Sequence, residues 1–182
     1  MLEDMLADLY QADPQWRIAC LRYFDPVGAH ESGLIGEAPQ ELPDNLMLYV
    51  AQVTAGKREY LNVWSDDYSK IDGTGVRDYI HVCDLVDGHV SSLEYLNRVH
   101  GLLTLYMGTG SEYSVLEVVK AFEKFSGRVI SDKIGPSKVG NIAMSLADTT
   151  LAQQLLDWKT SRCLEQMCAD AWRRQGSKLF AI

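Results

Sequence analysis

The chain has 182 residues, 47% of them hydrophobic and 23% charged, which is typical of one globular domain or of a half-domain with an appendage. Its formal net charge of −8 and its isoelectric point near 4.9 argue against sequence-independent binding to DNA or RNA, which requires a basic face. No apolar run approaches the roughly 20 residues of a membrane-spanning helix. We therefore expect neither a nucleic acid nor a membrane as a partner.

The cysteines and histidines lack the spacing of a metal site. Cys20, Cys83, Cys163 and Cys168 contain no C-x-x-C pair, and each lies in an apolar segment. This pattern predicts reduced, buried thiols in a cytoplasmic protein. The four histidines have no metal-ligand spacing either, so we expect no metal.

The first part of the chain predicts a helix, a strand and a turn. Four apolar residues with helical spacing predict one buried helix face: Leu2, Met5, Leu6 and Leu9. No N-cap residue precedes this helix, so the chain is expected to begin inside it. Residues 17–24 (RIACLRYF) predict a parallel strand covered on both faces, and residues 25–28 a turn. Ligands of open α/β sheets bind at such strand ends.

The middle of the chain predicts a loop, a helix and a short strand. Residues 30–43 contain two glycines and two prolines and predict irregular structure. A helix capped by Asp44 or Asn45 should follow, with these apolar residues on its buried face: Leu46, Tyr49, Val50 and Val53. Residues 60–65 alternate and predict a strand. Residues 66–75 predict a solvated polar turn, because their acids lack the spacing of a calcium loop.

Residues 72–90 (DGTGVRDYIHVCDLVDGHV) contain the strongest candidate for an anion site. A glycine turn leads through Arg77 into a predicted strand at 79–82, and a helix is predicted from about Asp84 to Val99. An arginine buried beside a strand end is costly unless an anion pairs with it. We therefore interpret Arg77 as the anion-binding residue of a substrate site.

The last part of the chain predicts these elements: a strand at 102–107, a helix that follows a Ser114–Glu117 capping box and ends at Gly127, a strand within 128–134, a loop at 136–147, and helices at 149–156 and from about 161. The two longer helices should bury Val115, Val118, Val119 and Phe122, and Leu164, Met167, Cys168 and Ala171. The alternation of strands and helices indicates an α/β chain with too few strands for a complete doubly wound domain plus a second domain.

No motif predicts a self-sufficient dinucleotide site. Such a site needs G-x-G-x-x-G between a strand and a helix. Residues 73–75 (GTG) precede a strand, and residues 108–110 (GTG) follow one but have Tyr113 in the third glycine position. We interpret both as turn glycines. There is no G-x-S-x-G motif for a catalytic serine either.

Several stretches together resemble the UDP-glucose 4-epimerases, NAD-dependent members of the extended short-chain dehydrogenase/reductase (SDR) family. Residues 22–30 (RYFDPVGAH) match R-Y-F-N-P-V-G-A-H, residues 45–47 match N-L-M, residues 73–82 match G-T-G-V-R-D-Y-I-H-V, and residues 115–119 match a late helix. The resemblance covers essentially the whole chain and implies the C-terminal half of such an enzyme. It implies a partial Rossmann-like fold: remnants of the NAD-binding domain at 1–28 and about 78–100, plus the small α/β substrate-binding domain.

The resemblance also implies site residues. Tyr23 and Phe24 would lie at the nicotinamide end of NAD. The implied positions that bind the UDP-sugar are Asp25, Asn45, Leu46, Asn62, Trp64, Arg77, Lys138 and Asn141. From the residues alone, Trp64 could equally be an ordinary core residue. Arg77 could pair with Asp72 or Asp78, although we favour the functional role.

Three departures from the family pattern should weaken binding of a nucleotide sugar. Asp25 replaces an asparagine, and an ionised carboxylate cannot donate a hydrogen bond and repels a diphosphate. Lys138 and Asn141 lie in P-S-K-V-G-N, where the family has P-R-R-x-G-D, so an arginine fork becomes a point charge. Leu146 replaces an aromatic residue.

The family's catalytic Tyr-x-x-x-Lys has no counterpart here, because by resemblance the chain starts just after that lysine and Tyr10 is followed by Pro14. We therefore expect no catalytic residue, no epimerase activity and no NAD bound by this chain alone, although the full-length family uses NAD. Expected partners are a UDP-sugar, bound weakly, and a second copy or an NAD-binding half. The alternatives are a non-catalytic nucleotide-sugar module and an interaction protein without a ligand.

Overall fold

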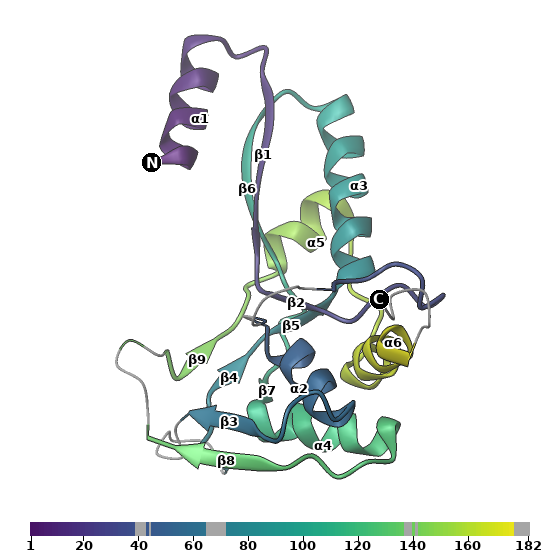
Figure 1. The fold of residues 1–182 in the computed structure, drawn as a ribbon. Coiled ribbons are helices and arrows are strands. Elements are labelled where there is room, and N and C mark those ends of the chain that lie inside the picture. The colour runs from purple at the N-terminus through teal and green to yellow at the C-terminus, as the bar shows by residue number, and fades with distance from the viewer. Residues whose placement is uncertain (39–42, 44, 65–71, 137–139, 141, 177–182) are drawn as a thin grey trace.

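The structure, a computed structural model, describes residues 1–38, 43, 45–64, 72–136, 140 and 142–176 (Figure 1). The helices are α1 (Leu2–Ala12), α2 (Leu46–Thr54), α3 (Val82–Arg98), α4 (Val115–Ser126), α5 (Thr150–Leu156) and α6 (Leu164–Gly176). The strands are β1 (Arg17–Tyr23), β2 (Asp25–Val27), β3 (Leu61–Trp64), β4 (Val76–Arg77), β5 (Tyr79–His81), β6 (Gly101–Met107), β7 (Tyr113–Ser114), β8 (Asp132–Gly135) and β9 (Met144–Ser145). None of the helices in these ranges is long and apolar enough to cross a bilayer.

The strands form short, mostly parallel ladders. β1 pairs with β6 in parallel, β2 with β5, and β3 with β8. β4 is the middle strand of a group of three, antiparallel to β7 and parallel to β9. Figure 1 shows the long β1–β6 ribbon at one end of the molecule, with α1 and α3 on opposite sides of it, and the remaining strands at the other end with α2, α4 and α6. The α/β class predicted from the sequence is confirmed.

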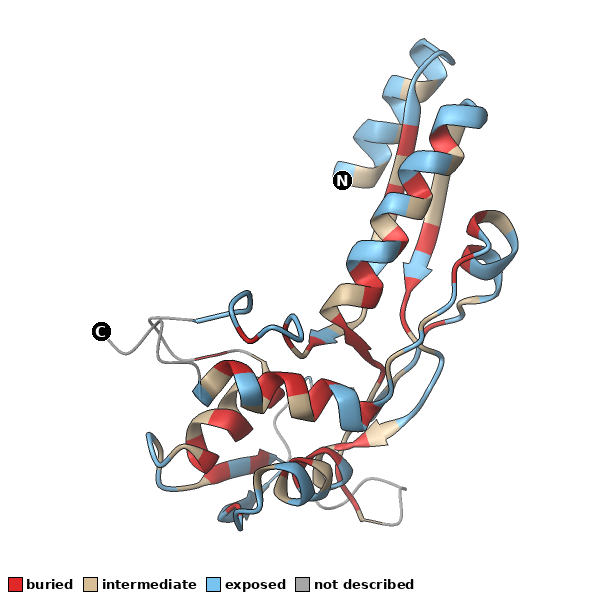
Figure 2. Ribbon diagram, turned by 90° about the vertical axis from the view of Figure 1, so that its right-hand side faces the viewer, coloured by how far each residue is buried: buried red, intermediate tan, exposed pale blue. Residues whose placement is uncertain are grey.

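Two hydrophobic cores correspond to these two ends. The core at the β1–β6 end contains Ile80, Leu85, Leu105, Met107, Ala152, Leu156 and Trp158, mainly from β6, α3 and α5. The larger core joins α2, α4 and α6 to β3 and includes Met47, Val50, Ala51, Leu61, Val63, Val118, Phe122, Met167 and Cys168. Figure 2 shows the buried residues lining the facing sides of these helices. β2 and β5 connect the two ends, since Val27 and Tyr79 belong to the second core and Ile80 to the first.

The local helix signals predicted the structure well. Ser114 and Glu117 form a reciprocal capping box, and α4 is followed by Gly127 in the left-handed region at φ 66°. Asn45 is the N-cap of α2, and its side chain accepts a hydrogen bond from the Met47 N–H. The four apolar residues predicted for the buried face of the last helix are all buried: Leu164, Met167, Cys168 and Ala171.

Other local predictions were wrong in detail. α3 begins at Val82 with His81 as its N-cap, two residues before the predicted start, because the His81 ring accepts from the Cys83 N–H. α2 buries Met47 and Ala51 in place of the predicted Leu46 and Tyr49, which are only half-buried, as is Val115 at the start of α4. The predicted loop at 136–147 contains the two-residue strand β9.

The strand β1 is less buried than its sequence predicted. Ile18 and Cys20 are buried, but Arg22 and Tyr23 are exposed. In the described part of the chain β1 has one paired edge, toward β6. The apolar face of α1 is also uncovered: this helix has no buried residue, and Met5 is 60% exposed. Figure 2 shows α1 almost entirely in the colour of exposed residues.

The four cysteines are free, but they are not all buried. Cys20 and Cys168 are buried, whereas Cys83 is half-buried and Cys163 is exposed at the start of α6, so the prediction of four buried thiols was wrong. Burial raises the pKa of Cys168 to about 12, which leaves it protonated and unreactive at neutral pH.

Candidate functional site

A cavity of about 290 Å³ brings together most of the predicted substrate positions. It is lined by Asp25, Asn45, Leu46, Asn62, Val63, Trp64, Gly75, Arg77, Tyr79, Val115 and Ile142. Six of the eight predicted substrate positions are among these, and they come from β2, the start of α2, β3 and β4. The other two, Lys138 and Asn141, lie outside the described residues. The site is therefore assembled from segments far apart in the sequence.

Successive side chains of β3 point to opposite faces of the strand, which brings two of the predicted side chains to the surface. Leu61 and Val63 are buried, whereas Asn62 and Trp64 are exposed on the opposite face of the strand. The Trp64 side chain is 40% exposed, so its interpretation as an ordinary core residue was wrong. Its ring lies over Gly135 of the paired strand β8, where an added Cβ would approach the ring to 3.2 Å. An amide beside a partly exposed indole ring offers hydrogen bonding and stacking to a planar heterocycle.

Arg77 lies at the end of β4 and is half-buried in the cavity wall. Its Nη1 donates to the Val76 carbonyl at 2.8 Å, and within the described ranges it forms no ion pair. The alternative partners considered from the sequence are engaged elsewhere. Asp72 accepts from Thr74 and Ser114, and Asp78 accepts from backbone groups of another loop. The guanidinium therefore retains donors for an anion in the cavity.

Asp78 organises the turn that follows β6. Its carboxylate is 0% exposed and accepts four hydrogen bonds: from the Thr109 N–H at 2.8 Å, the Thr109 hydroxyl at 2.6 Å, the Gly110 N–H at 2.8 Å and the Ala147 N–H at 3.2 Å. Gly108 permits this approach, because a Cβ there would lie 2.6 Å from an oxygen of Asp78. The N–H groups of this glycine turn are thus used by the chain's own carboxylate. In this structure the N–H groups of Thr109 and Gly110 are therefore not available to a pyrophosphate.

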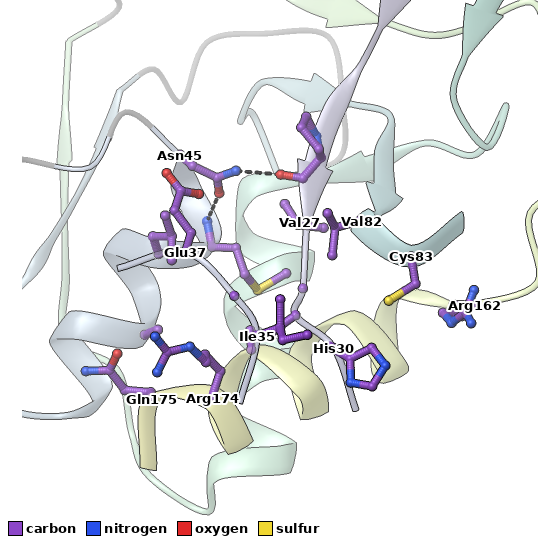
Figure 3. Close-up of a pocket in the computed structure, with 18 of the residues that line it drawn as sticks. Val27, His30, Ile35, Glu37, Asn45, Val82, Cys83, Arg162, Arg174 and Gln175 are labelled. Atoms are coloured by element: carbon purple, nitrogen blue, oxygen red, sulfur yellow. Dashed lines mark hydrogen bonds between the residues drawn. The ribbon is translucent and has the colours of Figure 1, made fainter. Parts of the chain in front are cut away.

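Asn45 differs from the other cavity residues because both ends of its amide are already used. Its Nδ2 donates to the Pro26 carbonyl at 2.7 Å, and its Oδ1 accepts from the Met47 N–H at 2.9 Å. Figure 3 draws both bonds. Asn45 therefore holds the N-terminus of α2 against β2, beside Asp25.

Asp25 is the one acidic side chain among the residues that line this cavity in the described structure. Its backbone N–H donates to the Asp78 carbonyl at 3.0 Å, while its carboxylate accepts no hydrogen bond from any described residue. Burial raises the pKa of Asp25, the positive charge of Arg77 opposes this, and the nearby Asp78 adds to it. Burial together with the Asp25 charge also raises the pKa of Tyr79, which lies opposite Asp25 in the β2–β5 ladder and stays neutral.

The two predicted cofactor positions lie outside this cavity. The hydroxyl of Tyr23 and Nε2 of His89 on α3 are 2.7 Å apart, and the Tyr23 side chain is 52% exposed. Phe24 is half-buried and meets the ring of Tyr106 edge to face at a centroid distance of 6.1 Å. Tyr23 and Phe24 are thus two adjacent aromatic residues at the carboxyl end of β1, immediately before Asp25. Whether this pair contacts NAD stays a prediction.

A larger cavity of about 680 Å³, which shares Asn45 with the smaller one, was not predicted. Figure 3 shows it between the loop that carries His30 and Ile35, the first turn of α3 with Val82, and the end of α6 with Arg174. Its lining is mostly apolar, and Asn45 is the one predicted site residue that it contains. Residues 26–30 of its lining belong to the motif at residues 22–30, but most of the rest comes from the loop at residues 35–37, α2, α3 and α6, so the sequence alone did not indicate a cavity here.

Two buried polar clusters were also missed from the sequence. His81 and Asp170 are 0% and 1% exposed, and Nε2 of His81 lies 3.3 Å from Asp170. Because Nδ1 of His81 accepts from the Cys83 N–H, we infer that Nε2 carries the proton toward Asp170. Asp84 on α3 accepts from Ser161 and Arg162 ahead of α6. The first cluster fastens the start of α3 to α6, and the second fastens it to the segment before α6; neither lines the smaller cavity.

The sequence of residues 1–102 matches the family model of the NAD dependent epimerase/dehydratase family. The chain belongs to this family, which confirms the Rossmann-like fold class. Within it, the chain is similar to the UDP-glucose 4-epimerases, as the motifs predicted: it is 52% identical over 179 residues to that of Bacillus subtilis (strain 168) and 50% identical over 174 residues to that of Homo sapiens. These alignments include 98% and 96% of the chain, but only 53% and 50% of the relatives.

Solved structures agree with this assignment. UDP-glucose-4-epimerase from Stenotrophomonas maltophila, with bound NAD and formylated UDP-arabinopyranose, superimposes with a TM-score of 0.93 at 48% identity over 96% of this chain and 52% of that one. The enzyme from Bifidobacterium longum, in complex with NAD+ and UDP, gives a TM-score of 0.90 at 47% identity over 95% and 51%. The chain thus spans about half the length of the relatives it matches.

Proposed function

We propose that the chain forms the nucleotide-sugar-binding part of a UDP-glucose 4-epimerase, an enzyme that interconverts UDP-glucose and UDP-galactose. The observation that carries this proposal is the convergence of six residues from four separate elements on one cavity. The family resemblance implies the same six residues from the sequence alone. Relatives of known structure bind UDP or a UDP-sugar together with NAD, which supports the same ligand class here.

The chemistry of the cavity suits the parts of such a ligand. The Trp64 indole would stack on uracil, and the Asn62 amide would hydrogen-bond its edge. The Arg77 guanidinium would bind the diphosphate through two parallel N–H donors. Lys138 would add a weaker contact as a point charge. The repulsion between Asp25 and phosphate predicts modest affinity.

The test is calorimetric titration of UDP into the wild type, Arg77→Ala, Arg77→Lys and the control Arg98→Ala, which removes an exposed arginine at the end of α3. Charge-assisted hydrogen bonds contribute about 1.5–3 kcal/mol, so Arg77→Ala should weaken binding at least about tenfold. The affinity of Arg77→Lys for UDP should lie between those of the wild type and Arg77→Ala. Lys138→Ala should weaken binding less than Arg77→Ala does, and Arg98→Ala should bind UDP as tightly as the wild type. Normal binding by Arg77→Ala would place the site elsewhere.

We further propose that the chain does not epimerise by itself. The motif Tyr-x-x-x-Lys is absent from its sequence, and the glycine turn after β6 is occupied by Asp78. Conversion of UDP-galactose to UDP-glucose with added NAD should therefore stay at the background of a buffer control. Turnover that disappears in Arg77→Ala would contradict this proposal, since contaminating epimerase would not respond to a substitution in this chain.

Catalysis would then require a partner that supplies an NAD-binding half. The uncovered apolar face of α1 and the single paired edge of β1 within the described residues are suited to such an association. A non-catalytic role for the nucleotide-sugar site is the second candidate function. It is favoured by Asp25, which works against tight binding of a diphosphate substrate.

A further inference from the structure

The smaller cavity contains two opposite charges that a diphosphate would affect differently. Arg77 supplies the positive charge, and Asp25 supplies a negative charge on the neighbouring strand β2. In the described structure they do not form an ion pair, although the charge of Arg77 is close enough to influence Asp25. An anion that binds Arg77 would therefore come close to a carboxylate that has no hydrogen-bond donor of its own among the described residues.

The surroundings of Asp25 differ from those of the other acidic side chains in this region. Asp78 accepts four hydrogen bonds, and Asp72 accepts from Thr74 and Ser114. Such donors stabilise the ionised form of a carboxylate. Asp25 has none from the described residues and is partly removed from water, so the positive charge of Arg77 is the influence that favours its ionised form.

Binding of a diphosphate would remove that support. The phosphates would neutralise Arg77, add negative charge beside Asp25 and displace water from the cavity, and each of these changes disfavours the ionised carboxylate. The charged or titratable groups that face Asp25 in the described structure are Arg77, Asp78 and Tyr79. Tyr79 is neutral, and Asp78 is held by four donors, so neither can compensate for the neutralised arginine.

We propose that this site binds a nucleotide diphosphate together with one proton, and that Asp25 takes up this proton from solvent. The neutral carboxyl group then has an O–H that donates a hydrogen bond to a phosphate oxygen, as an asparagine amide would at this position. Asp25 thus makes ligand affinity depend on pH, with tighter binding in mildly acidic conditions. This inference rests on the proposed function, because it requires the cavity to bind a UDP-sugar.

The experiment is calorimetric titration with UDP-glucose at several pH values between 5 and 8, each in two buffers of different ionisation enthalpy. UDP-glucose is the appropriate probe because both of its phosphates are esterified, so it lacks the second ionisation near pH 6 of a terminal phosphate. The wild type and Asp25→Asn are compared. Asparagine is nearly isosteric with aspartate and can donate a hydrogen bond without taking up a proton.

The wild type should take up between about half a proton and one proton per UDP-glucose bound. Its Kd should therefore rise by up to about tenfold for each unit by which the pH increases. Asp25→Asn should take up almost no proton, and its Kd should change less than about twofold over the same range. Binding by the wild type without proton uptake overturns the inference and leaves the proposed function standing. Equal uptake by Asp25→Asn overturns it too, because another group would then be titrating.

Two further results separate the remaining cases. If Asp25→Asn fails to fold, Asp25→Ala takes its place: it removes the titrating carboxyl group and should take up almost no proton, and uptake equal to that of the wild type overturns the inference. If neither protein binds UDP-glucose at any pH, the proposed function itself is wrong, and the inference fails with it.

Discussion

The amide of Asn45 donates to the carbonyl of Pro26 at 2.7 Å, and its oxygen accepts from the Met47 N–H at 2.9 Å. One side chain therefore caps α2 and also fastens this helix to β2 at the residue that follows Asp25. Asn45 lines the cavity, but in this structure it acts on the cavity wall through these two backbone groups.

Replacement of Asn45 should separate these two roles. Asn45→Ala removes the cap and the tether and should lower the free energy of unfolding by about 1–2 kcal/mol. Asn45→Asp keeps a cap acceptor at a helix N-terminus but loses the donor to Pro26, so a smaller loss is expected. Urea titrations measure both, with the exposed Asn97→Ala as control. Equal stability of Asn45→Ala and the wild type would show that the tether contributes nothing.

Asp78→Asn should be strongly destabilising although it changes few atoms. The buried carboxylate accepts from three backbone N–H groups and one hydroxyl, whereas an asparagine would turn an NH2 group toward at least one of these donors. We expect a loss of about 3 kcal/mol, because hydrogen bonds to a charged acceptor are replaced by unsatisfied buried groups. Urea unfolding of this variant is compared with that of Asp132→Asn, which lies on the surface. A loss no larger than that of the control would contradict this account of the turn.

His81 should make the protein less stable as the pH falls. Burial lowers the pKa of His81 in the folded protein, and its bond to Asp170 opposes this only in part. Below the ordinary histidine pKa of about 6.5, the unfolded chain binds a proton that the folded protein does not. The free energy of unfolding should therefore fall as the pH decreases from about 6.5 through the lowered folded-state pKa.

Urea titrations at about pH 7.5, 6.5 and 5.5 measure this effect. His81→Gln should be less stable at neutral pH, because Asp170 loses a partner, but its stability should vary less over this range. His100→Gln, which changes an exposed histidine, should keep the wild-type pH dependence. The same slope in His81→Gln as in the wild type would assign the pH dependence to another group.

The isolated chain should self-associate through α1 and the neighbouring edge of β1. Leu2 is 74% exposed and Met5 is 60% exposed, and α1 has no buried residue. Exposed apolar faces and unpaired strand edges favour association. The double variant Leu2→Gln/Met5→Gln should shift sedimentation toward the monomer, whereas Val129→Gln, at a 90% exposed position elsewhere, should not. A wild type that sediments strictly as a monomer and unfolds cooperatively would refute this prediction.

Local patterns in the sequence determined the elements that depend on neighbouring residues. The Ser114–Glu117 capping box, the left-handed Gly127 and the Asn45 cap each involve groups within a few residues of one another, so their spacing is visible in the sequence. The family resemblance was likewise visible, because it rests on contiguous motifs. Together they were sufficient for the α/β class and for six of the eleven residues that line the smaller cavity.

Only the tertiary structure decided which polar groups are buried and what they contact. The partners of Asp78, Asp84 and His81 are separated from them by 31, 77 and 89 positions in the chain. No local spacing predicts such pairs. The residue type aspartate does not show whether its carboxylate is solvated or accepts four hydrogen bonds. The environment of Asp25 was decided in the same way. The motif shows that an aspartate replaces asparagine at this position, but the partial burial that raises the pKa of Asp25 depends on segments distant in the chain, including Arg77 of β4 and Tyr79 of β5.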